Sequence, residues 1–302
     1  MRAPLRRYRS VMSDSARWNE FNFRDDDIVI SAPVKCGATW IQMICALLIF
    51  QRRTFPSKLD DISPWLEMLT RPLDEVLSDL QAQNHRRFIK SHTPLDGLPF
   101  HERVTYVCVA RDPRDVAISL DNHMANLNVT ALLFALRTGA GLGDFSELGQ
   151  TSRARPSNMR KRFLQWVDEP QSGGLRATIH HVQTFWEARQ RPNVILLHYG
   201  DLKADLEAQM RGLAMRLDLS VRPDLWSELV KAATFVEMRK RADELVPNAT
   251  EALWHENARF FNKGSNGQWK RHLREADLLH YRARITELAN PDLVAWLHQA
   301  PL

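Results

Sequence analysis

Cysteine is scarce in this sequence of 302 residues: only Cys36, Cys45 and Cys108 occur, each within an apolar stretch. An odd number of cysteines placed in this way argues against a disulfide framework and favours reduced thiols in a reducing compartment. Long apolar runs are also missing. The longest, at residues 38–50, falls short of the roughly 20 residues that cross a bilayer. We therefore expect a soluble, cytoplasmic protein with no membrane among its partners.

The N-terminus, MRAPLRRYRS, is basic but lacks the apolar stretch that completes a secretory signal. Residues 1–20 are therefore predicted to form a flexible tail. Glycine and proline are infrequent, with 12 and 15 occurrences, and 44% of the residues are hydrophobic. This composition is that of an ordinary globular chain, and the length suits one large domain, which we place at residues 21–302.

Neither sign of charge dominates, because the sequence has 41 lysine and arginine residues and 36 aspartate and glutamate residues. The formal charge of +5 and the pI of about 9.3 suit anionic ligands such as nucleotides or nucleic acids without deciding between them. The sequence shows no helix-turn-helix, zinc-finger or RNP signature. A nonenzymatic protein that binds RNA or DNA through its basic residues is therefore kept only as an alternative, and we expect no nucleic-acid partner.

Short β-branched apolar runs alternate with longer helical patterns along the chain. The predicted strands are residues 27–32, 87–90, 104–110 and 193–198. Helices are expected to begin near residues 38, 113, 178 and 201. This order is typical of a single α/β domain with a mostly parallel central sheet flanked by helices, in which ligands bind at the carboxyl ends of the strands. Residues 125–174, rich in glycine and polar residues, are expected to form loops and short helices around a pocket.

The turn between the first strand and the first helix reads APVKCGATW, residues 32–40. In such a P-loop-like strand–loop–helix unit, free N–H groups and the positive helix end bind a phosphate, while Lys35 and Thr39 add a charge and a hydroxyl. In a kinase P-loop the lysine follows the last glycine, and the adjacent hydroxyl residue holds magnesium. Here Lys35 precedes Gly37. A nucleotide kinase dependent on ATP and magnesium, or a plain apolar helix with a lysine at its start, remain alternatives for this loop alone.

A second strand also leads into a helix beside basic residues, in the segment RDPRDVAIS at residues 111–119. Asp112 can cap this helix and Pro113 can occupy its first position. A cation at the end of the strand and Ser119 further along suit a second phosphate. Alternatively, the arginines of this segment pair with its aspartates, as isolated charge runs commonly do.

Together these segments resemble motifs of the cytosolic sulfotransferase family. The first loop, PVKCGATW, is similar to the family's PKSGTTW, and RDPRDVAISL is similar to RNPKDVAVSY. Between them KSHTP, residues 90–94, resembles KTHLP, and NKGSNGQWK, residues 262–270, resembles RKGxxGDWK. The likeness spans residues 27–270. It implies an enzyme that moves a sulfuryl group from 3′-phosphoadenosine 5′-phosphosulfate (PAPS) to a hydroxyl group and releases 3′-phosphoadenosine 5′-phosphate (PAP).

The resemblance also implies site residues, carried over by position. His92 is the expected general base, because an imidazole can take the acceptor's proton near neutral pH. Lys35 and Lys90 are expected to stabilise the charge that develops in the transition state, without a metal ion. The residues expected to bind PAPS are Lys35, Cys36, Gly37, Ala38, Thr39, Trp40, Arg111, Ser119, Tyr199, Thr234, Phe235, Asn262, Lys263 and Gly264.

Several positions depart from the family pattern. Asn262 replaces an arginine expected on the 3′-phosphate, so that phosphate could depend on Arg111, Ser119 and Lys263, or on another cation such as Arg114 or Arg259. The segment after Trp269 lacks the family's dimer motif, which leaves a monomer and a homodimer open. A sulfotransferase-like chain that has lost its activity is a further alternative.

The acceptor is predicted to be a small apolar or aromatic compound with a hydroxyl group. Aromatic residues in and near residues 125–174 suggest such a site, although each can equally belong to the core. The predicted acceptor-binding residues are Phe134, Phe145, Phe163, Trp166 and His181.

Overall fold

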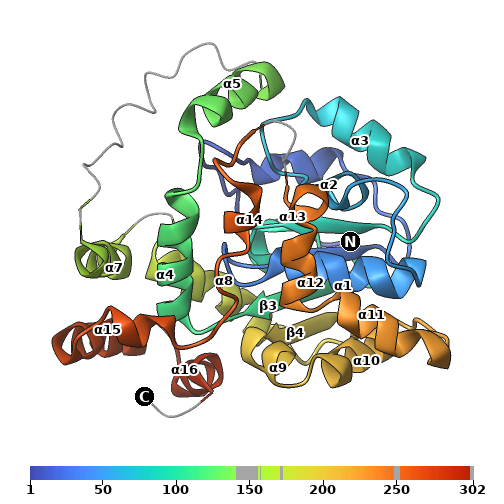
Figure 1. The fold of residues 1–302 in the computed structure, drawn as a ribbon. Coiled ribbons are helices and arrows are strands. Elements are labelled where there is room, and N and C mark those ends of the chain that lie inside the picture. Colours follow the sequence, from blue (N-terminus) through green and yellow to red (C-terminus); the bar gives the residue numbers. More distant parts are fainter. Residues whose placement is uncertain (141–155, 157, 171–172, 248–251, 300–302) are drawn as a thin grey trace.

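Four parallel strands form the central sheet of the computed structural model, which describes residues 1–140, 156, 158–170, 173–247 and 252–299 (Figure 1). The strands are β1 (Ile28–Ser31), β2 (Phe88–Ser91), β3 (Thr105–Ala110) and β4 (Val194–His198), in the spatial order β2-β1-β3-β4. All four predicted strands are present, each shorter or displaced by a residue or two at its ends. The single α/β domain with a parallel sheet flanked by helices is confirmed.

Strand β1 occupies the interior of the sheet, where Ile28 pairs with Phe88 on one side and with Thr105 on the other. Every residue of β1 is buried. Successive side chains point to opposite faces, so that Ile28 and Ile30 join the larger core cluster and Val29 joins a second one. A strand covered on both faces must be apolar throughout, which explains the continuous hydrophobic run.

Helices follow the strands as the sequence predicts. After β1 comes α1 (Ala38–Phe50), after β3 comes α4 (Pro113–Met124), and after β4 comes α9 (Tyr199–Ala204). Asp112 caps α4 by accepting a hydrogen bond from the backbone N–H of Arg114 at 2.9 Å, and Pro113 is the first residue of the helix. The predicted helix start at this position is confirmed. The helix expected from residue 178 is α8 (Leu175–Glu187).

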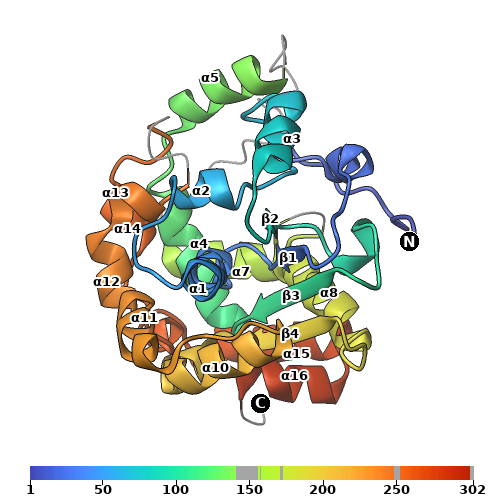
Figure 2. The same ribbon diagram turned by 90° about the vertical axis from the view of Figure 1, so that its right-hand side faces the viewer.

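The remaining helices surround the sheet, with α3 near the β2 edge and α16 near the β4 edge (Figure 2). They are η1 (Ser15–Glu20), α2 (Leu59–Ile62), α3 (Leu73–Ala82), η2 (Leu95–Gly97), α5 (Val129–Ala140), α7 (Met159–Asp168), α10 (Leu206–Arg216), η3 (Pro223–Leu225), α11 (Trp226–Ala232), α12 (Phe235–Lys240), α13 (Ala242–Leu245), α14 (Asn257–Phe260), η4 (Gln268–Arg271), α15 (Glu275–Leu288) and α16 (Pro291–His298). In the part of the chain that the structure describes, no helix combines the length and the apolarity of a membrane span.

The first twenty residues differ from the predicted flexible tail. Arg2 forms a β-bridge with Phe100, and Ser13 forms one with Met68. Trp18 is 1% exposed, and its indole N–H donates a hydrogen bond to Glu67 Oε1 at 2.6 Å. This packing could not be predicted from the sequence, because the residues that anchor the segment are single aromatic and polar side chains. They form no periodic pattern among the basic residues around them.

Candidate active site

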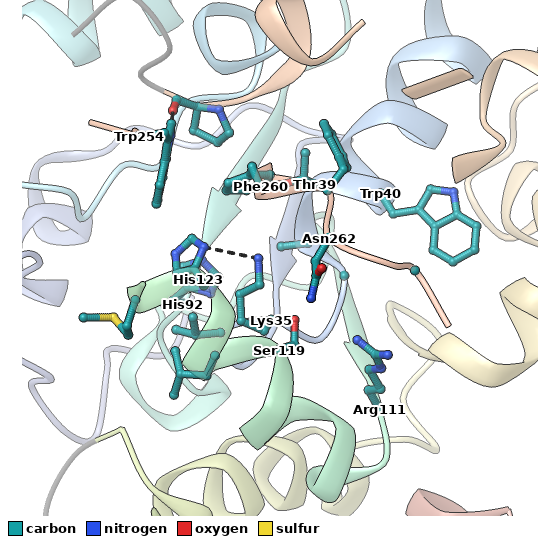
Figure 3. Close-up of a pocket in the computed structure, with 18 of the residues that line it drawn as sticks. Lys35, Thr39, Trp40, His92, Arg111, Ser119, His123, Trp254, Phe260 and Asn262 are labelled. Atoms are coloured by element: carbon teal, nitrogen blue, oxygen red, sulfur yellow. Dashed lines mark hydrogen bonds between the residues drawn. The ribbon is translucent and has the colours of Figure 1, made fainter. Parts of the chain in front are cut away.

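A cavity of about 300 Å³ lies at the carboxyl ends of the strands. Each strand contributes a residue just beyond its end: Lys35 after β1, His92 after β2, Arg111 after β3 and Tyr199 after β4. Figure 3 shows most of these side chains around the same space. The predicted PAPS-binding residues that line the cavity are Lys35, Gly37, Ala38, Thr39, Trp40, Arg111, Ser119, Tyr199, Phe235, Asn262, Lys263 and Gly264. Lys90 and His92 line it as well.

The loop before α1 has the backbone of an anion site. Lys35 has a φ of 68° and Gly37 a φ of 120°, and the positive φ of Lys35 is a conformation that costs a side-chain-bearing residue free energy. No side chain caps the start of α1 at Gly37, so the first N–H groups of the helix remain available to a ligand. Cys36, by contrast, is fully buried in the core and does not line the cavity.

The ammonium group of Lys35 lies between two aromatic rings from distant parts of the chain. It is 3.3 Å from His123 Nδ1 and 4.4 Å from the centroid of Phe260 (Figure 3). Burial, and then the charges of Lys90 and Arg111, lower the pKa of Lys35 to about 7. A bound anion would restore the charged form, because an opposite charge raises the pKa of an amine.

His123 is a cavity residue that our sequence interpretation missed. It follows Ser119 by four residues on α4, so one face of the helix presents both side chains. The spacing of four residues from Ser119 is the sequence pattern from which His123 could have been predicted as a site residue. Burial, followed by the charge of Lys35, lowers the pKa of His123 well below its ordinary value, which leaves its Nδ1 free to accept the hydrogen bond from Lys35.

Arg111 is oriented by two contacts and retains an unused donor. Its Nη2 donates to the carbonyl oxygen of Ser265 at 2.7 Å, and its guanidinium carbon lies 4.3 Å from the ring centroid of Tyr199. The buried Nε atom has no hydrogen-bond partner among the described residues. A buried donor without a partner is costly, and an anionic oxygen in the cavity would satisfy it.

The segment that carries Asn262, Lys263 and Gly264 is fastened to α4 by a carboxylate. Asp115, 1% exposed, accepts hydrogen bonds from the backbone N–H groups of Gly267 at 2.7 Å and Gln268 at 2.8 Å. The neighbouring contact between Arg111 and Ser265 ties the same segment to the end of β3. Asp115 thus serves this segment, whereas Arg114 pairs with Asp112, as the alternative interpretation of this charge run supposes.

Neither of the two arginines considered as substitutes for the missing arginine at Asn262 lines the cavity. Arg114 forms an ion pair with Asp112 at 2.7 Å and lies 4.0 Å from the ring centroid of Trp269. Arg259 is largely exposed and is 3.9 Å from Glu256. The charged groups on this side of the cavity are accordingly Arg111 and Lys263.

The rings of Trp40, Tyr199 and Phe235 form one end of the cavity. Trp40 is held by a hydrogen bond from its indole N–H to the carbonyl oxygen of Ala233 at 2.8 Å and meets Tyr199 edge to face at 5.1 Å. Gly264 has a φ of 60°, and a β-carbon at this position would lie 2.4 Å from the ring of Phe235. Only glycine lets the backbone approach that ring so closely.

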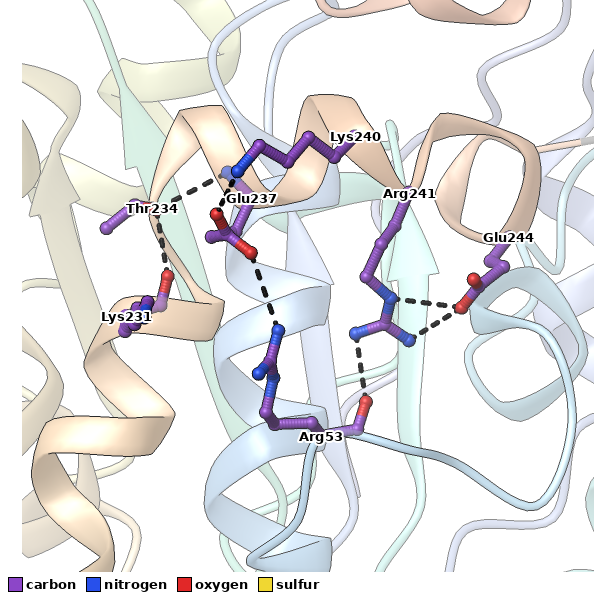
Figure 4. Close-up of polar contacts among 7 residues, drawn as sticks. All are labelled: Arg53, Lys231, Thr234, Glu237, Lys240, Arg241 and Glu244. Carbon is purple, nitrogen blue, oxygen red and sulfur yellow. Dashed lines mark hydrogen bonds and ion pairs between the residues drawn. The ribbon is translucent and has the colours of Figure 1, made fainter.

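Thr234 supports this end of the cavity without lining it. Its hydroxyl donates to the carbonyl oxygen of Lys231 at 2.8 Å and accepts from the N–H of Glu237, which caps α12 (Figure 4). Glu237 in turn pairs with Lys240 at 2.7 Å and with Arg53 at 3.4 Å. Thr234 therefore fixes the start of α12, whose first residue, Phe235, lines the cavity.

His92 has the tautomer that a base requires. Its Nδ1–H donates to the carbonyl oxygen of Ala32 at 2.6 Å, so Nε2 carries the free lone pair. Burial, and then the charge of Lys90, lower the pKa of His92 well below its ordinary value. The ring meets Trp65 edge to face at 4.7 Å. The imidazole is therefore neutral near pH 7 and fixed in direction.

The predicted acceptor-binding residues are not brought together at this cavity. Phe134 is 70% exposed, whereas Phe163 and Trp166 are buried and line a separate pocket that shares Leu120 and Met124 with this cavity. His181 is buried beside Ser31, whose hydroxyl lies 2.9 Å from His181 Nε2. Phe145 lies outside the described residues. The apolar wall of the cavity consists instead of Met12, Trp65, Met68, Met124, Leu127, Leu253, Trp254 and Phe260. No cluster of three potential metal ligands occurs among the residues that the structure describes.

Comparisons with known proteins show the family of the chain. The family described as "Sulfotransferase domain" matches residues 25–290. Glycolipid sulfotransferases of Mycobacterium bovis and Mycobacterium tuberculosis are each 40% identical to the chain, with 97% of this chain and 94% of the relative covered. Human sulfotransferase 1E1 is 26% identical, with 88% and 86% covered.

Solved structures share the fold. Retinol dehydratase in complex with androsterone and the inactive cofactor PAP superposes with a TM-score of 0.70 at 20% identity, covering 92% of this chain and 86% of the other. A mouse sulfotransferase complexed with PAP gives a TM-score of 0.66 at 19% identity, covering 94% and 92%. The kinase and nucleic-acid alternatives are thereby set aside. The chain belongs to the sulfotransferase family, and the PAPS-dependent sulfotransferase predicted from its sequence motifs is confirmed as an enzyme class.

Proposed function

We propose that this sulfotransferase transfers the sulfuryl group of PAPS to the hydroxyl of an acceptor with a large apolar part, and that His92 is the general base. The observation that carries the proposal is the neutral imidazole of His92, whose Nδ1–H is bound to Ala32 and which lines the same cavity as Lys35. A base must present its lone pair to the reacting proton before its pKa matters.

The donor end of the cavity fits the phosphates and base of PAPS. The loop at Lys35 and Gly37 and the free start of α1 suit the 5′-phosphosulfate. The unpartnered Nε of Arg111, with Ser119 and Lys263, suits the 3′-phosphate. The rings of Trp40 and Phe235 offer flat surfaces to adenine.

PAPS supplies an activated sulfuryl group, and the residues of this chain manage the proton and the charge. His92 Nε2 accepts the acceptor's hydroxyl proton as the acceptor oxygen bonds to sulfur. The bond from sulfur to the 5′-phosphate oxygen breaks, and its electron pair leaves with PAP. Lys35 is placed to stabilise that negative charge, and Lys90, whose pKa burial lowers to about 8, is placed to offset the charge on the sulfuryl oxygens.

The apolar wall supports an acceptor with a lipid-like body, since methionine, leucine and tryptophan side chains dominate it. The names of the glycolipid sulfotransferases among the relatives point in the same direction. We further propose a cytoplasmic location, because Cys36, Cys45 and Cys108 are all free thiols.

Transfer of labelled sulfate from PAPS to a panel of phenols, steroids and long-chain alcohols tests the acceptor class. We expect the long-chain alcohols to be preferred, with a rate that EDTA leaves unchanged. A thermal-shift comparison in which PAP stabilises the protein and ADP does not tests the donor. Turnover confined to small phenols would contradict the proposed acceptor, and a magnesium requirement would contradict the metal-free mechanism.

A further inference from the structure

A second, more polar chamber of about 190 Å³ adjoins the cavity. This volume is several times the roughly 30 Å³ that one water molecule occupies in the liquid. Trp65, Met68, Lys90 and Pro247 line both spaces. The residues that line the chamber alone are Gln42, Asp60, Asp61, Ser63, Pro64, Thr70, Arg71 and Val76.

Two polar atoms of residues that line the chamber are buried without a hydrogen-bond partner among the described residues: Gln42 Oε1 and Trp65 Nε1. Gln42 is 1% exposed, and its amide is held in place because Nε2 donates to the carbonyl oxygen of Ser63 at 2.7 Å and lies 3.1 Å from Ser63 Oγ. One acceptor and one donor of the lining residues are thus left without a partner among the described residues. Buried polar groups in folded proteins are rarely left in this state.

The charges around the chamber balance. The lining includes two carboxylates, Asp60 and Asp61, and two cations, Arg71 and Lys90. Arg71 is already paired with Asp79 at 2.6 Å, and Lys90 lies 5.1 Å from the ring centroid of Trp65. A lining with donors, acceptors and no net charge suits a neutral ligand rich in hydroxyl groups rather than a phosphate or an amine.

We propose that this chamber binds a glycosyl group of the acceptor. The inference rests on the proposed function and refines it: the apolar wall of the main cavity receives the aliphatic part, and the chamber receives the sugar. Trp65 connects the two, because its ring lines both spaces and lies 4.7 Å from His92. A sugar that extends from the chamber past Trp65 would bring its hydroxyl groups toward the proposed base, which lines the main cavity.

Two acceptors with the same alkyl chain, one with a sugar and one without, distinguish the contribution of the sugar to kcat/KM from that of the chain. Octyl β-D-glucoside and 1-octanol are compared by kcat/KM for labelled sulfuryl transfer, in the intact enzyme and in Gln42→Leu. The substitution keeps the side-chain volume and removes the unpartnered amide oxygen. We expect kcat/KM for the glucoside to fall roughly 3- to 10-fold, the range of one net hydrogen bond, and kcat/KM for octanol to stay within about 2-fold.

Gln83→Leu is a matched control. Gln83 Oε1 is also buried without a described partner, and Gln83 Nε2 also donates to backbone oxygens, those of Asp61 and Ile62. Gln83 lines neither space, so its replacement should leave the ratio of the two kcat/KM values unchanged. Trp65→Phe, which removes the indole N–H and keeps a ring, should lower the glucoside-to-octanol ratio as Gln42→Leu does.

These experiments distinguish a failure of the proposed glycosyl site from a failure of the proposed function. No transfer to either acceptor, together with no PAP binding in calorimetry, would refute the sulfotransferase function itself. Transfer to octanol with an unchanged glucoside-to-octanol ratio in Gln42→Leu and Trp65→Phe would overturn the glycosyl site alone. An equal fall for both acceptors in Gln42→Leu would assign Gln42 a purely structural role and would also overturn it.

Discussion

Replacing Asp115 by asparagine should weaken PAP binding, although Asp115 does not line the cavity. Its carboxylate accepts the N–H groups of Gly267 and Gln268 at 2.7 and 2.8 Å and so holds the segment that carries Lys263 and Gly264. Asparagine keeps nearly the same shape but has a single acceptor oxygen. One of the two N–H groups would then face an amide NH₂ group, which cannot accept a hydrogen bond.

The expected magnitude follows from the kind of bond lost. A hydrogen bond to a charged group contributes about 1.5–3 kcal/mol. If the segment must be in place for PAP to bind, that loss appears in the binding free energy and raises the Kd of PAP by roughly 10- to 100-fold. The free energy of unfolding should change by less than the binding free energy of PAP, since the segment lies at the surface and much of it is exposed.

Calorimetric titration of PAP into the intact enzyme and Asp115→Asn measures this effect, and amide hydrogen exchange across residues 262–268 reports whether the segment loosens. Asp224→Asn is the control, because Asp224 pairs with Arg222 at the exposed surface. A Kd that changes less than about 2-fold, with unchanged exchange in the segment, would refute the role assigned to Asp115.

Three further predictions concern the cavity and the buried histidines. His92→Ala should abolish sulfuryl transfer and leave the Kd of PAP within about 3-fold of its original value. Turnover that persists would remove His92 from the mechanism. A loss of PAP binding together with turnover would point to misfolding. Asn262→Arg should tighten PAP binding about 10-fold by adding a charge-assisted hydrogen bond, as measured by calorimetry, and no gain would show that Arg111 and Lys263 suffice. The folded chain keeps His92, His123 and His181 neutral, because burial lowers the pKa of each, whereas the unfolded chain protonates them near pH 6.5. The free energy of unfolding should therefore decrease below about pH 6.5, by up to ~1.4 kcal/mol per pH unit for each histidine, and urea unfolding at several pH values that shows no decrease would contradict their neutrality.

The half of the site that we propose binds the phosphates of PAPS could be located from the sequence because it is made of continuous segments. Each strand, turn and helix start carries its own local signal: apolar β-branched residues, a glycine at positive φ, or an aspartate–proline pair at a helix start. The positions of Lys35, His92 and Arg111 beyond three strand ends follow from those signals once the sheet is parallel.

The acceptor half could not be predicted in this way. Its wall combines Met12, Met68, Leu127 and Trp254, which come from segments far apart in the chain and belong to no repeating pattern. The aromatic residues selected from the sequence, such as Phe163 and Trp166, are large and apolar, and these properties suit a core as well as a cavity wall; both residues are buried and line a pocket other than this one. Residue type alone does not distinguish a cavity wall from a core; only the tertiary contacts do.

The order of the strands has a consequence for how the chain reaches its folded state during synthesis. β1 is made first, yet its partners begin 60 residues later, at Phe88 opposite Ile28, and 77 residues later, at Thr105 opposite the same residue. β4 follows β3 by a further 88 residues, with Val194 opposite Tyr106. Such distant pairings form slowly, so the apolar strand β1 stays without its neighbours in the sheet until the segments of β2 and β3 have been synthesised. The loop that follows β1 is therefore synthesised well before the strands that flank β1 and fix its place in the sheet.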